Sequence, residues 1–170
     1  ARGTSIYSAT PGGSSWTSID SGRTGASKYR FERFNFDGTD KIIFVDGTNA
    51  PVVFNSSLSA TDVSDSSVAG ATYVSIFRDH MFYAGMTGSP QELVFSAPFD
   101  EDSFSSGQGA GSIKVDDTIT GIKVFRDNLF VFCENRIFKL AGSSVTNFTM
   151  TDITRDIGCI NGDTIQEFAG

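Results

Sequence analysis

The chain has 170 residues, with 20 Asp and Glu against 13 Lys and Arg, and a formal net charge of −7. This length fits one ordinary domain, and the acidic balance argues against a protein that attracts nucleic acid or anionic lipid through its bulk field. The sequence holds 16 Phe and 18 Gly but only four Leu, a composition that favours strands and turns over helices. No apolar run approaches the roughly 18 residues that a membrane-spanning helix needs. We therefore expect an all-β protein.

The first 27 residues are rich in Gly, Ser and Thr, and we expect a loop-rich stretch there with one weak strand at residues 5–8. The chain begins at Ala1 without an initiator Met or a signal-peptide pattern. We expect the natural N-terminus to lie elsewhere.

A repeat is visible further along the chain. Residues 73–84 and 121–132 both contain a β-rich run, the triplet Phe-Arg-Asp, one polar residue and a second β-rich run. This pattern is typical of a hairpin with a tight polar turn. A fainter copy spans residues 34–45. Alignment of Phe36, Phe77 and Phe125 gives spacings of 41 and 48 residues, and we expect Phe77 and Phe125 to be core residues.

Each hairpin is followed by a further short apolar run, at residues 52–54, 93–96 and 137–140, and we expect a fourth strand at residues 145–150. Units of three or four antiparallel strands in about 40 to 50 residues have the size of a β-propeller blade. Some runs are apolar throughout, as in residues 42–45. Such strands are buried on both faces, which favours a propeller over a two-sheet sandwich.

We therefore predict an antiparallel β-propeller segment of about three blades in residues 28–170. The units lie near 28–70, 71–117 and 118–156, and residues 157–170 are the start of a fourth, with its first strand in 162–170. Three blades do not close a ring, so we expect the chain to be a fragment of a larger protein. A β-sandwich adhesion domain is the structural alternative.

Several polar groups are candidates for chemistry, and each also has a structural interpretation. Carboxylates near the first hairpin, and two acidic runs later in the chain, have the ligand type that Ca²⁺ prefers, but none shows the spacing of an EF-hand loop. We interpret them as solvated turns. The carboxylates concerned are Asp37, Asp40, Asp46, Asp100, Glu101, Asp102, Asp116 and Asp117.

Residues 18–24 match the Ser-x-Asp-x-Gly-x-Thr turn of sialidase-type propellers, but Gly25 replaces the aromatic residue that follows the motif. We interpret the match as chance.

His80 is the only His, and we expect it in a hairpin turn, as for Asn128 in the other copy. One His excludes a His-based metal cage. The equivalent residues Arg78 and Arg126 are expected to bind their neighbouring Asp.

The basic residues in 28–34 alternate with aromatic residues and predict a strand with one charged face. Cys133 and Cys159 are expected to be reduced and buried, with a disulfide as the alternative. Taken together, the motifs predict no catalytic, cofactor-binding or metal site and no enzyme.

The run Pro90-Gln-Glu-Leu-Val-Phe-Ser, the hairpin Phe125-Arg-Asp-Asn and the runs Asn135-Arg-Ile-Phe and Gly158-Cys-Ile-Asn-Gly resemble the propeller region of tailed-phage tail proteins. The similar families are the podovirus tail nozzle, also called tail tubular protein B, and the related tail-hub proteins. The resemblance covers residues 29–170.

This resemblance implies a structural virion protein in a ring of identical subunits at the end of a short tail. Its partners would be the portal-adaptor and tail fibre proteins, DNA would pass without specific binding, and no membrane or cofactor would be involved. The alternative is a carbohydrate-binding or carbohydrate-processing propeller. That function needs exposed aromatic and acidic residues, and the single Trp16 lies in the loop-rich stretch.

Overall fold

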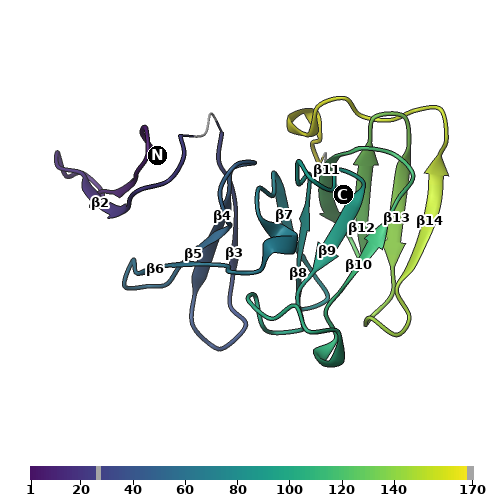
Figure 1. The fold of residues 1–170 in the computed structure, drawn as a ribbon, viewed down its shortest axis with the longest axis horizontal. Coiled ribbons are helices and arrows are strands. Elements are labelled where there is room, and N and C mark those ends of the chain that lie inside the picture. The colour runs from purple at the N-terminus through teal and green to yellow at the C-terminus, as the bar shows by residue number, and fades with distance from the viewer. Residues whose placement is uncertain (26–27, 168–170) are drawn as a thin grey trace.

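The computed structural model describes residues 1–25 and 28–167, and within them the protein is all-β, with no α-helix and 14 strands in four antiparallel sheets (Figure 1). No helix in this part of the chain is long and apolar enough to cross a membrane. The expected all-β, antiparallel fold class is confirmed. A small sheet consists of β1 (Ile6–Ser8) and β2 (Thr17–Asp20).

Three larger sheets each contain four strands that pair in chain order. Three short 3₁₀ helices lie outside the sheets: η1 (Ser66–Val68), η2 (Ser106–Gln108) and η3 (Gly162–Thr164). Sheet 1 contains β3 (Arg30–Phe34), β4 (Lys41–Val45), β5 (Val52–Phe54) and β6 (Ala60–Asp62). Sheet 2 contains β7 (Tyr73–Phe77), β8 (His80–Ala84), β9 (Glu92–Phe95) and β10 (Gly111–Lys114). Sheet 3 contains β11 (Ile119–Phe125), β12 (Asn128–Cys133), β13 (Ile137–Ala141) and β14 (Thr149–Thr154).

The repeated hairpins form the first two strands of sheets 2 and 3. Phe77 pairs with His80 and Phe125 pairs with Asn128, so each turn has two residues. Arg78 and Asp79 have φ values of 50° and 65°, as a type I′ hairpin turn requires. In sheet 1 the pairing is Phe34 with Lys41. Phe34 is therefore the structural equivalent of Phe77, and the alignment on Phe36 is wrong because this turn is longer.

Some expected strand positions are also wrong. The strand expected at residues 145–150 begins only at Thr149. Residues 162–164 form η3, and residues 165–167 form no strand; residues 168–170 lie outside the described residues. Strands β2, β6 and β10 were not expected. The sequences Thr-Ser-Ile-Asp and Ala-Thr-Asp carry almost no apolar signal, and their backbone pairing with a neighbouring strand holds them in place.

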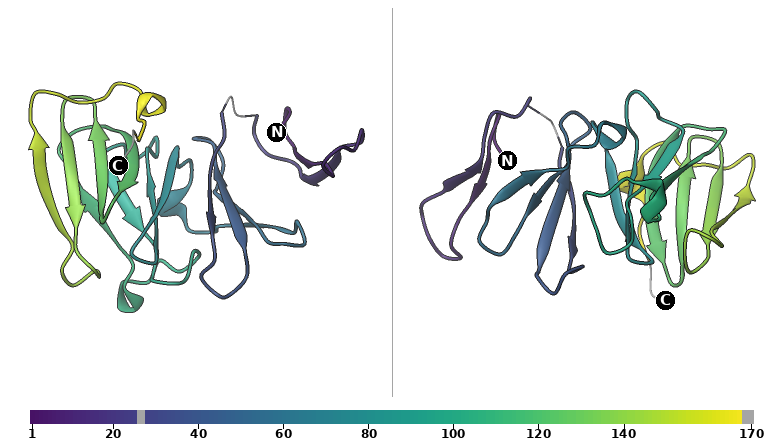
Figure 2. Two further views of the ribbon diagram at one scale, coloured as in Figure 1. Left: turned by 180° about the vertical axis from the view of Figure 1, so that it is seen from behind. Right: turned by 60° about the horizontal axis from the view of Figure 1, so that its bottom comes forward.

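The three larger sheets are stacked face to face. Alternate side chains of a strand point to opposite faces, and on β8 Tyr83 packs toward sheet 1 whereas Phe82 packs toward sheet 3. The first strands contact one another in succession, β3 with β7 and β7 with β11, while β6 and β14 lie at opposite sides of the molecule (Figures 1 and 2). Sheet 2 is thus buried on both faces, which explains its continuous apolar runs.

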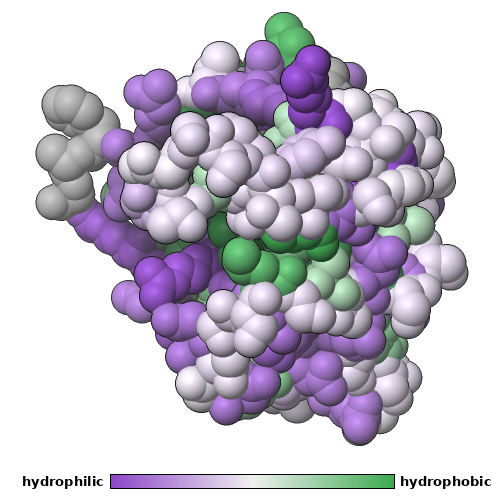
Figure 3. All heavy atoms as spheres, turned by 90° about the vertical axis from the view of Figure 1, so that its left-hand side faces the viewer, coloured by the Kyte–Doolittle hydropathy of each residue, from purple (hydrophilic) through white to green (hydrophobic). Residues whose placement is uncertain are grey.

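The small sheet covers part of the outer face of sheet 1. Ile6 packs against Val52 and Phe54, which are both 1% exposed, whereas Phe31 on β3 remains 63% exposed. Figure 3 views this end of the molecule, where hydrophobic side chains lie in a hollow between more polar residues.

The two equivalent Phe residues differ in environment. Phe77 is 4% exposed and packs between sheets 2 and 3, as expected. Phe125 is only half-buried, because it lies on the face of sheet 3 that no other sheet covers. The expectation that Phe125 is a core residue is wrong for the chain as described.

This difference gives a matched pair of substitutions. Phe77→Ala is expected to lower the free energy of unfolding by about 3–5 kcal/mol, since it leaves a cavity. Phe125→Ala is expected to cost about 1 kcal/mol, because part of its ring is already in water. Urea unfolding of both variants measures the difference, and equal losses would contradict the stacking order.

Candidate functional site

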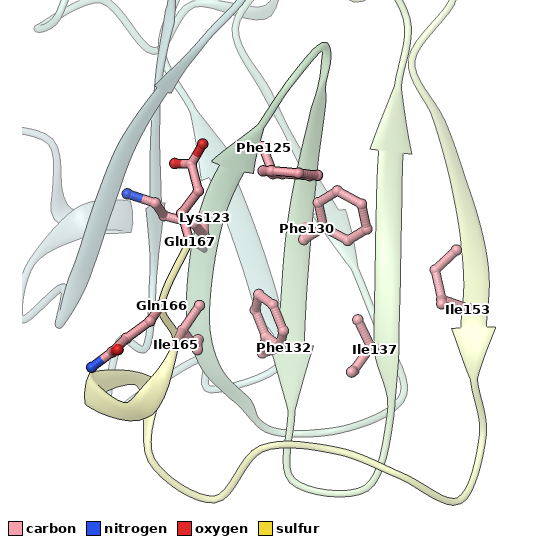
Figure 4. A pocket seen from close by; sticks show the side chains of 9 residues that line it. All are labelled: Lys123, Phe125, Phe130, Phe132, Ile137, Ile153, Ile165, Gln166 and Glu167. Atoms are coloured by element: carbon pink, nitrogen blue, oxygen red, sulfur yellow. The ribbon is translucent and has the colours of Figure 1, made fainter. Parts of the chain in front are cut away.

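A hydrophobic surface lies on the side of sheet 3 that faces away from sheet 2, and we call it the open face. It surrounds a hollow of about 410 Å³. Figure 4 shows side chains from all four strands pointing to this side of the sheet, with Ile165 beside Phe132. Seven residues of the open face and two at its margin line the hollow: Lys123, Phe125, Phe130, Phe132, Ile137, Ile153 and Ile165, then Gln166 and Glu167.

The open face follows from the sequence of β12. Leu129, Val131 and Cys133 are fully buried against sheet 2. Phe130 and Phe132 alternate with them and so point to the other side, where both are half-buried. The apolar run is evident in the sequence of β12, but its division between a buried face and an outward face was not predicted.

The first strands of the three sheets bring a group of polar residues together. Glu32 on β3, Ser75 on β7 and Lys123 on β11 occupy equivalent registers. Burial raises the pKa of the Glu32 carboxyl, while the positive charge of Lys123 and a hydrogen bond from Ser75 oppose this shift. This layer contains a carboxylate whose charge is incompletely compensated.

A neighbouring layer ties sheet 1 to the segment that follows sheet 3. The guanidinium of Arg30 lies over the Tyr73 ring, 4.6 Å from its centroid, and Arg30 Nη2 donates to Asp163 Oδ1 at 2.8 Å. Lys28 also forms an ion pair with Asp163. Hydrogen bonds from Lys28 and Arg30 lower the pKa of the Asp163 carboxyl.

The expectation of one charged face on β3 is therefore wrong. Arg30 and Glu32 point toward sheet 2, and Arg33 alternates with them and pairs with Asp40 on the outside at 2.7 Å. Arg30 and Arg33 are three positions apart, and alternate residues of a strand point to opposite faces, so the basic residues could not share one face.

Each acidic residue around the first hairpin serves its own turn. Asp37 Oδ1 accepts from the Thr39 backbone N at 2.9 Å, and Asp46 Oδ1 accepts from that of Thr48 at 2.9 Å. Hydrogen bonds lower the pKa of the carboxyls of Asp37 and Asp40, from Lys41 and Arg33 respectively. The described residues contain no group of three side chains that could hold a metal ion.

The run Asp100-Glu101-Asp102 does not act as one cluster. Glu101 is mostly buried and binds Lys41 Nζ at 2.8 Å, which joins this loop to sheet 1. Asp102 Oδ1 accepts from Ser64 N at 3.3 Å. The interpretation as a solvated turn is wrong for Glu101. The later pair is also engaged, with Asp116 bound to Arg136 at 2.7 Å and Asp117 accepting from Asn135 N at 2.7 Å.

His80 is a core residue and not a turn residue. It begins β8, is 2% exposed, and its Nδ1 lies 2.6 Å from the carbonyl oxygen of Ser96. Its ring centroid lies 5.5 Å from those of Phe95 and Phe148. Because a carbonyl oxygen only accepts, Nδ1 carries the proton in this arrangement.

Arg78 does not bind its neighbour Asp79 but connects sheet 2 to sheet 3. Its Nε donates to the carbonyl oxygen of Gly142 at 3.0 Å, and its Nη2 donates to that of Asp127 at 3.3 Å. Asp127 occupies the position of Asp79 in the next hairpin. Arg126, the equivalent of Arg78, stacks on Phe125 at 5.2 Å.

Residues 18–24 fix the small sheet to sheet 1. Arg23 is 8% exposed, and its Nη1 lies 3.2 Å from Asp20 and 3.1 Å from Asp62 on β6. Its Nη2 donates to the carbonyl oxygen of Ala50 at 2.7 Å. Arg23 was not predicted as a candidate residue, since only its burial in the folded chain distinguishes it.

Both cysteines are free thiols. Cys133 is buried, and burial raises its pKa to about 12. Cys159 is half-buried, and its backbone N donates to the carbonyl oxygen of Cys133 at 2.7 Å. The expectation of burial is confirmed for Cys133 alone.

Comparison with known proteins gives no family model that matches this chain and no significant match among curated proteins.

Arg23→Ala is expected to lower the free energy of unfolding by about 2–3 kcal/mol, because it leaves a mostly buried Asp20 carboxylate without its cation. Chemical denaturation measures the loss. Arg155→Ala removes an exposed pair with Asp152 and serves as the control, with an expected cost below about 0.5 kcal/mol. Equal effects would contradict the assignment of Arg23 as the link between the two sheets.

Glu32→Gln is expected to raise the thermal midpoint at pH 7. The folded pKa of Glu32 is raised, so ionisation opposes folding at pH values above that pKa, and the penalty vanishes below the unfolded pKa. The gain should therefore shrink as the pH falls toward 4. Melting curves from pH 4 to pH 8 test this, and a gain that is constant across this range would contradict it.

Proposed function

We propose that the chain is a structural protein of a tailed-phage virion, a β-propeller segment in the nozzle or hub ring through which DNA leaves a short tail. In this proposal sheets 1–3 are successive blades, β3, β7 and β11 are the strands nearest the propeller axis, and the chain has no enzymatic activity.

The observation that carries the proposal is the repeated stacking of four-stranded meanders with their first strands in contact. Radial repetition of four-stranded sheets is the construction of propeller blades. The resemblance of residues 29–170 to tail nozzle and hub proteins supplies the virion setting. The partners are then identical subunits, portal-adaptor proteins and tail fibres.

The negative charge of the chain supports a role in a channel that lets DNA pass without binding it. The net charge is −7, and eight of the 13 Lys and Arg residues form ion pairs within the described part of the chain. Contacts from Lys and Arg to phosphate provide most of the non-specific affinity for DNA. A surface poor in free cations lets DNA pass.

Electron microscopy of the purified native assembly tests the proposal. We expect a ring with rotational symmetry and an axial channel, and antibodies against the chain should label the tail of the phage that encodes it. A monomer without a ring, or labelling elsewhere on the particle, would contradict the virion assignment.

One observation favours the carbohydrate-binding alternative. Trp16 is 70% exposed, and with Arg2 and Tyr7 it lines a hollow of about 400 Å³ at the small sheet. Exposed aromatic rings beside a guanidinium suit the apolar face and hydroxyls of a sugar.

A glycan array separates the two functions. The virion proposal predicts no glycan signal above background for the purified chain. A signal that Trp16→Ala abolishes, while the exposed control Phe31→Ala on the neighbouring sheet retains it, would favour the carbohydrate-binding propeller.

A further inference from the structure

The open face of sheet 3 repeats a face that is covered elsewhere in the molecule. On sheet 2 the side chains that point away from sheet 1 are buried against sheet 3. The strand registers place apolar side chains of sheet 3 at the same four positions, on its far side. The equivalent residues are Phe77 and Phe125, Phe82 and Phe130, Ala84 and Phe132, and Leu93 and Ile137.

The two copies of this face differ in exposure. Phe82 and Leu93 are fully buried, whereas Phe130 and Ile137 are half-buried and line the hollow. A contiguous apolar patch of this kind marks a binding surface. The open face therefore has the composition of a sheet-to-sheet contact.

The chain after β14 turns back toward β11 and the open face. Residues 155–167 return across the end of sheet 3 to β11 (Figure 1), and η3 contacts β11. A Cβ on Gly162 in η3 would clash with the backbone carbonyl oxygen of Thr120 on β11, so this close approach requires glycine. Between sheets 1 and 2, residues 63–72 make the same return from β6 to β7, also through a side-chain-capped 3₁₀ helix, η1.

The charges on the open face indicate what would cover it. Within the described residues Arg126 forms no ion pair, nor does Lys139, which lies opposite Phe130; the charge of Lys123 already acts on Glu32. Arg78, the equivalent of Arg126, bridges to the hairpin turn of the next sheet at Asp127. The covering element should therefore present carboxylates, one of them in a hairpin turn.

The outer face of sheet 1 in a second copy offers only part of such a partner surface. The corresponding outer face of sheet 1 is already covered over Val52 and Phe54 by the small sheet. We propose that the open face of sheet 3 docks a further four-stranded antiparallel sheet of this same repeat, carried on the polypeptide that passes over β11 at Ile165. Its aliphatic face packs on Phe130 and Phe132, and its first hairpin turn supplies the carboxylate for Arg126.

This inference deepens the proposed function. It rests on the propeller arrangement but not on the virion assignment, which the ring test examines separately. A failure of docking would leave a symmetric ring possible, and the absence of a ring would leave the docking face unaffected.

The test compares the chain with an extended chain in which a second copy of residues 118–167 follows Glu167. Both carry Ile153→Cys on the open face of the first sheet 3 alone and Cys159→Ser in every copy, and buried Cys133 remains as an unreactive thiol. We measure the rate of maleimide labelling. The matched control is Ser106→Cys on η2, which is exposed and outside sheet 3.

We expect labelling of Ile153→Cys to be at least about 10-fold slower in the extended chain, as burial of the site requires, with Ser106→Cys unchanged. Arg126→Ala in the first copy should restore part of the rate. An unchanged rate in an extended chain with added strand content would overturn the proposal. Concentration-dependent protection in the unextended chain, with a dimeric mass, would overturn it in favour of a second copy.

A second measurement applies if the extension does not fold. The unextended chain should bind an apolar dye such as anilinonaphthalene sulfonate at the open face. The pair of substitutions Phe130→Ser and Phe132→Ser should remove most of this fluorescence, whereas Phe31→Ser should not. Fluorescence that is unaffected by the open-face pair would overturn the proposal.

Discussion

The burial of both faces of sheet 2, the middle one of three stacked four-stranded sheets, is the constraint on which the rest of this structure depends. A strand such as β8, with every residue buried, cannot lie at the surface of a two-layer protein, because one of its faces would meet water. Sheets 1 and 3 supply the two contacts that sheet 2 needs. Two apolar layers between stacked sheets therefore replace a single central core, and sheet 3, at one end of the stack, presents an apolar face.

The polar residues align the stacked sheets. Arg78 joins successive hairpin turns, Glu101 joins a loop of sheet 2 to Lys41, and Asp163 joins the returning chain to Arg30. Each contact links different sheets or their loops, at the ends or margins of the apolar layers. Apolar layers alone tolerate sliding, and directional hydrogen bonds to charged groups fix one relative position. This assigns several of the acidic and basic residues to assembly of the fold, consistent with the structural role that we propose.

The fold class could be predicted from the sequence because hairpins 73–84 and 121–132 repeat both composition and turn chemistry. The strand boundaries could be predicted less well where strands are polar, as in β6, since backbone pairing leaves little trace in side-chain type. The fainter repeat in sheet 1 was misaligned on Phe36, because a longer turn displaces the aromatic residue. The burial of His80 and Arg23 could not be predicted, since it depends on neighbours distant in sequence. The open face could have been found by placing Phe130 on the register of Phe82.

The most direct test is a cryo-electron microscopy map of the native assembly at side-chain resolution. The account predicts that sheets 1–3 fan around one axis with β3, β7 and β11 innermost, and that a further four-stranded sheet covers Phe130 and Phe132. A map in which sheet 3 faces solvent on that side, or in which the three sheets share no axis, would contradict it.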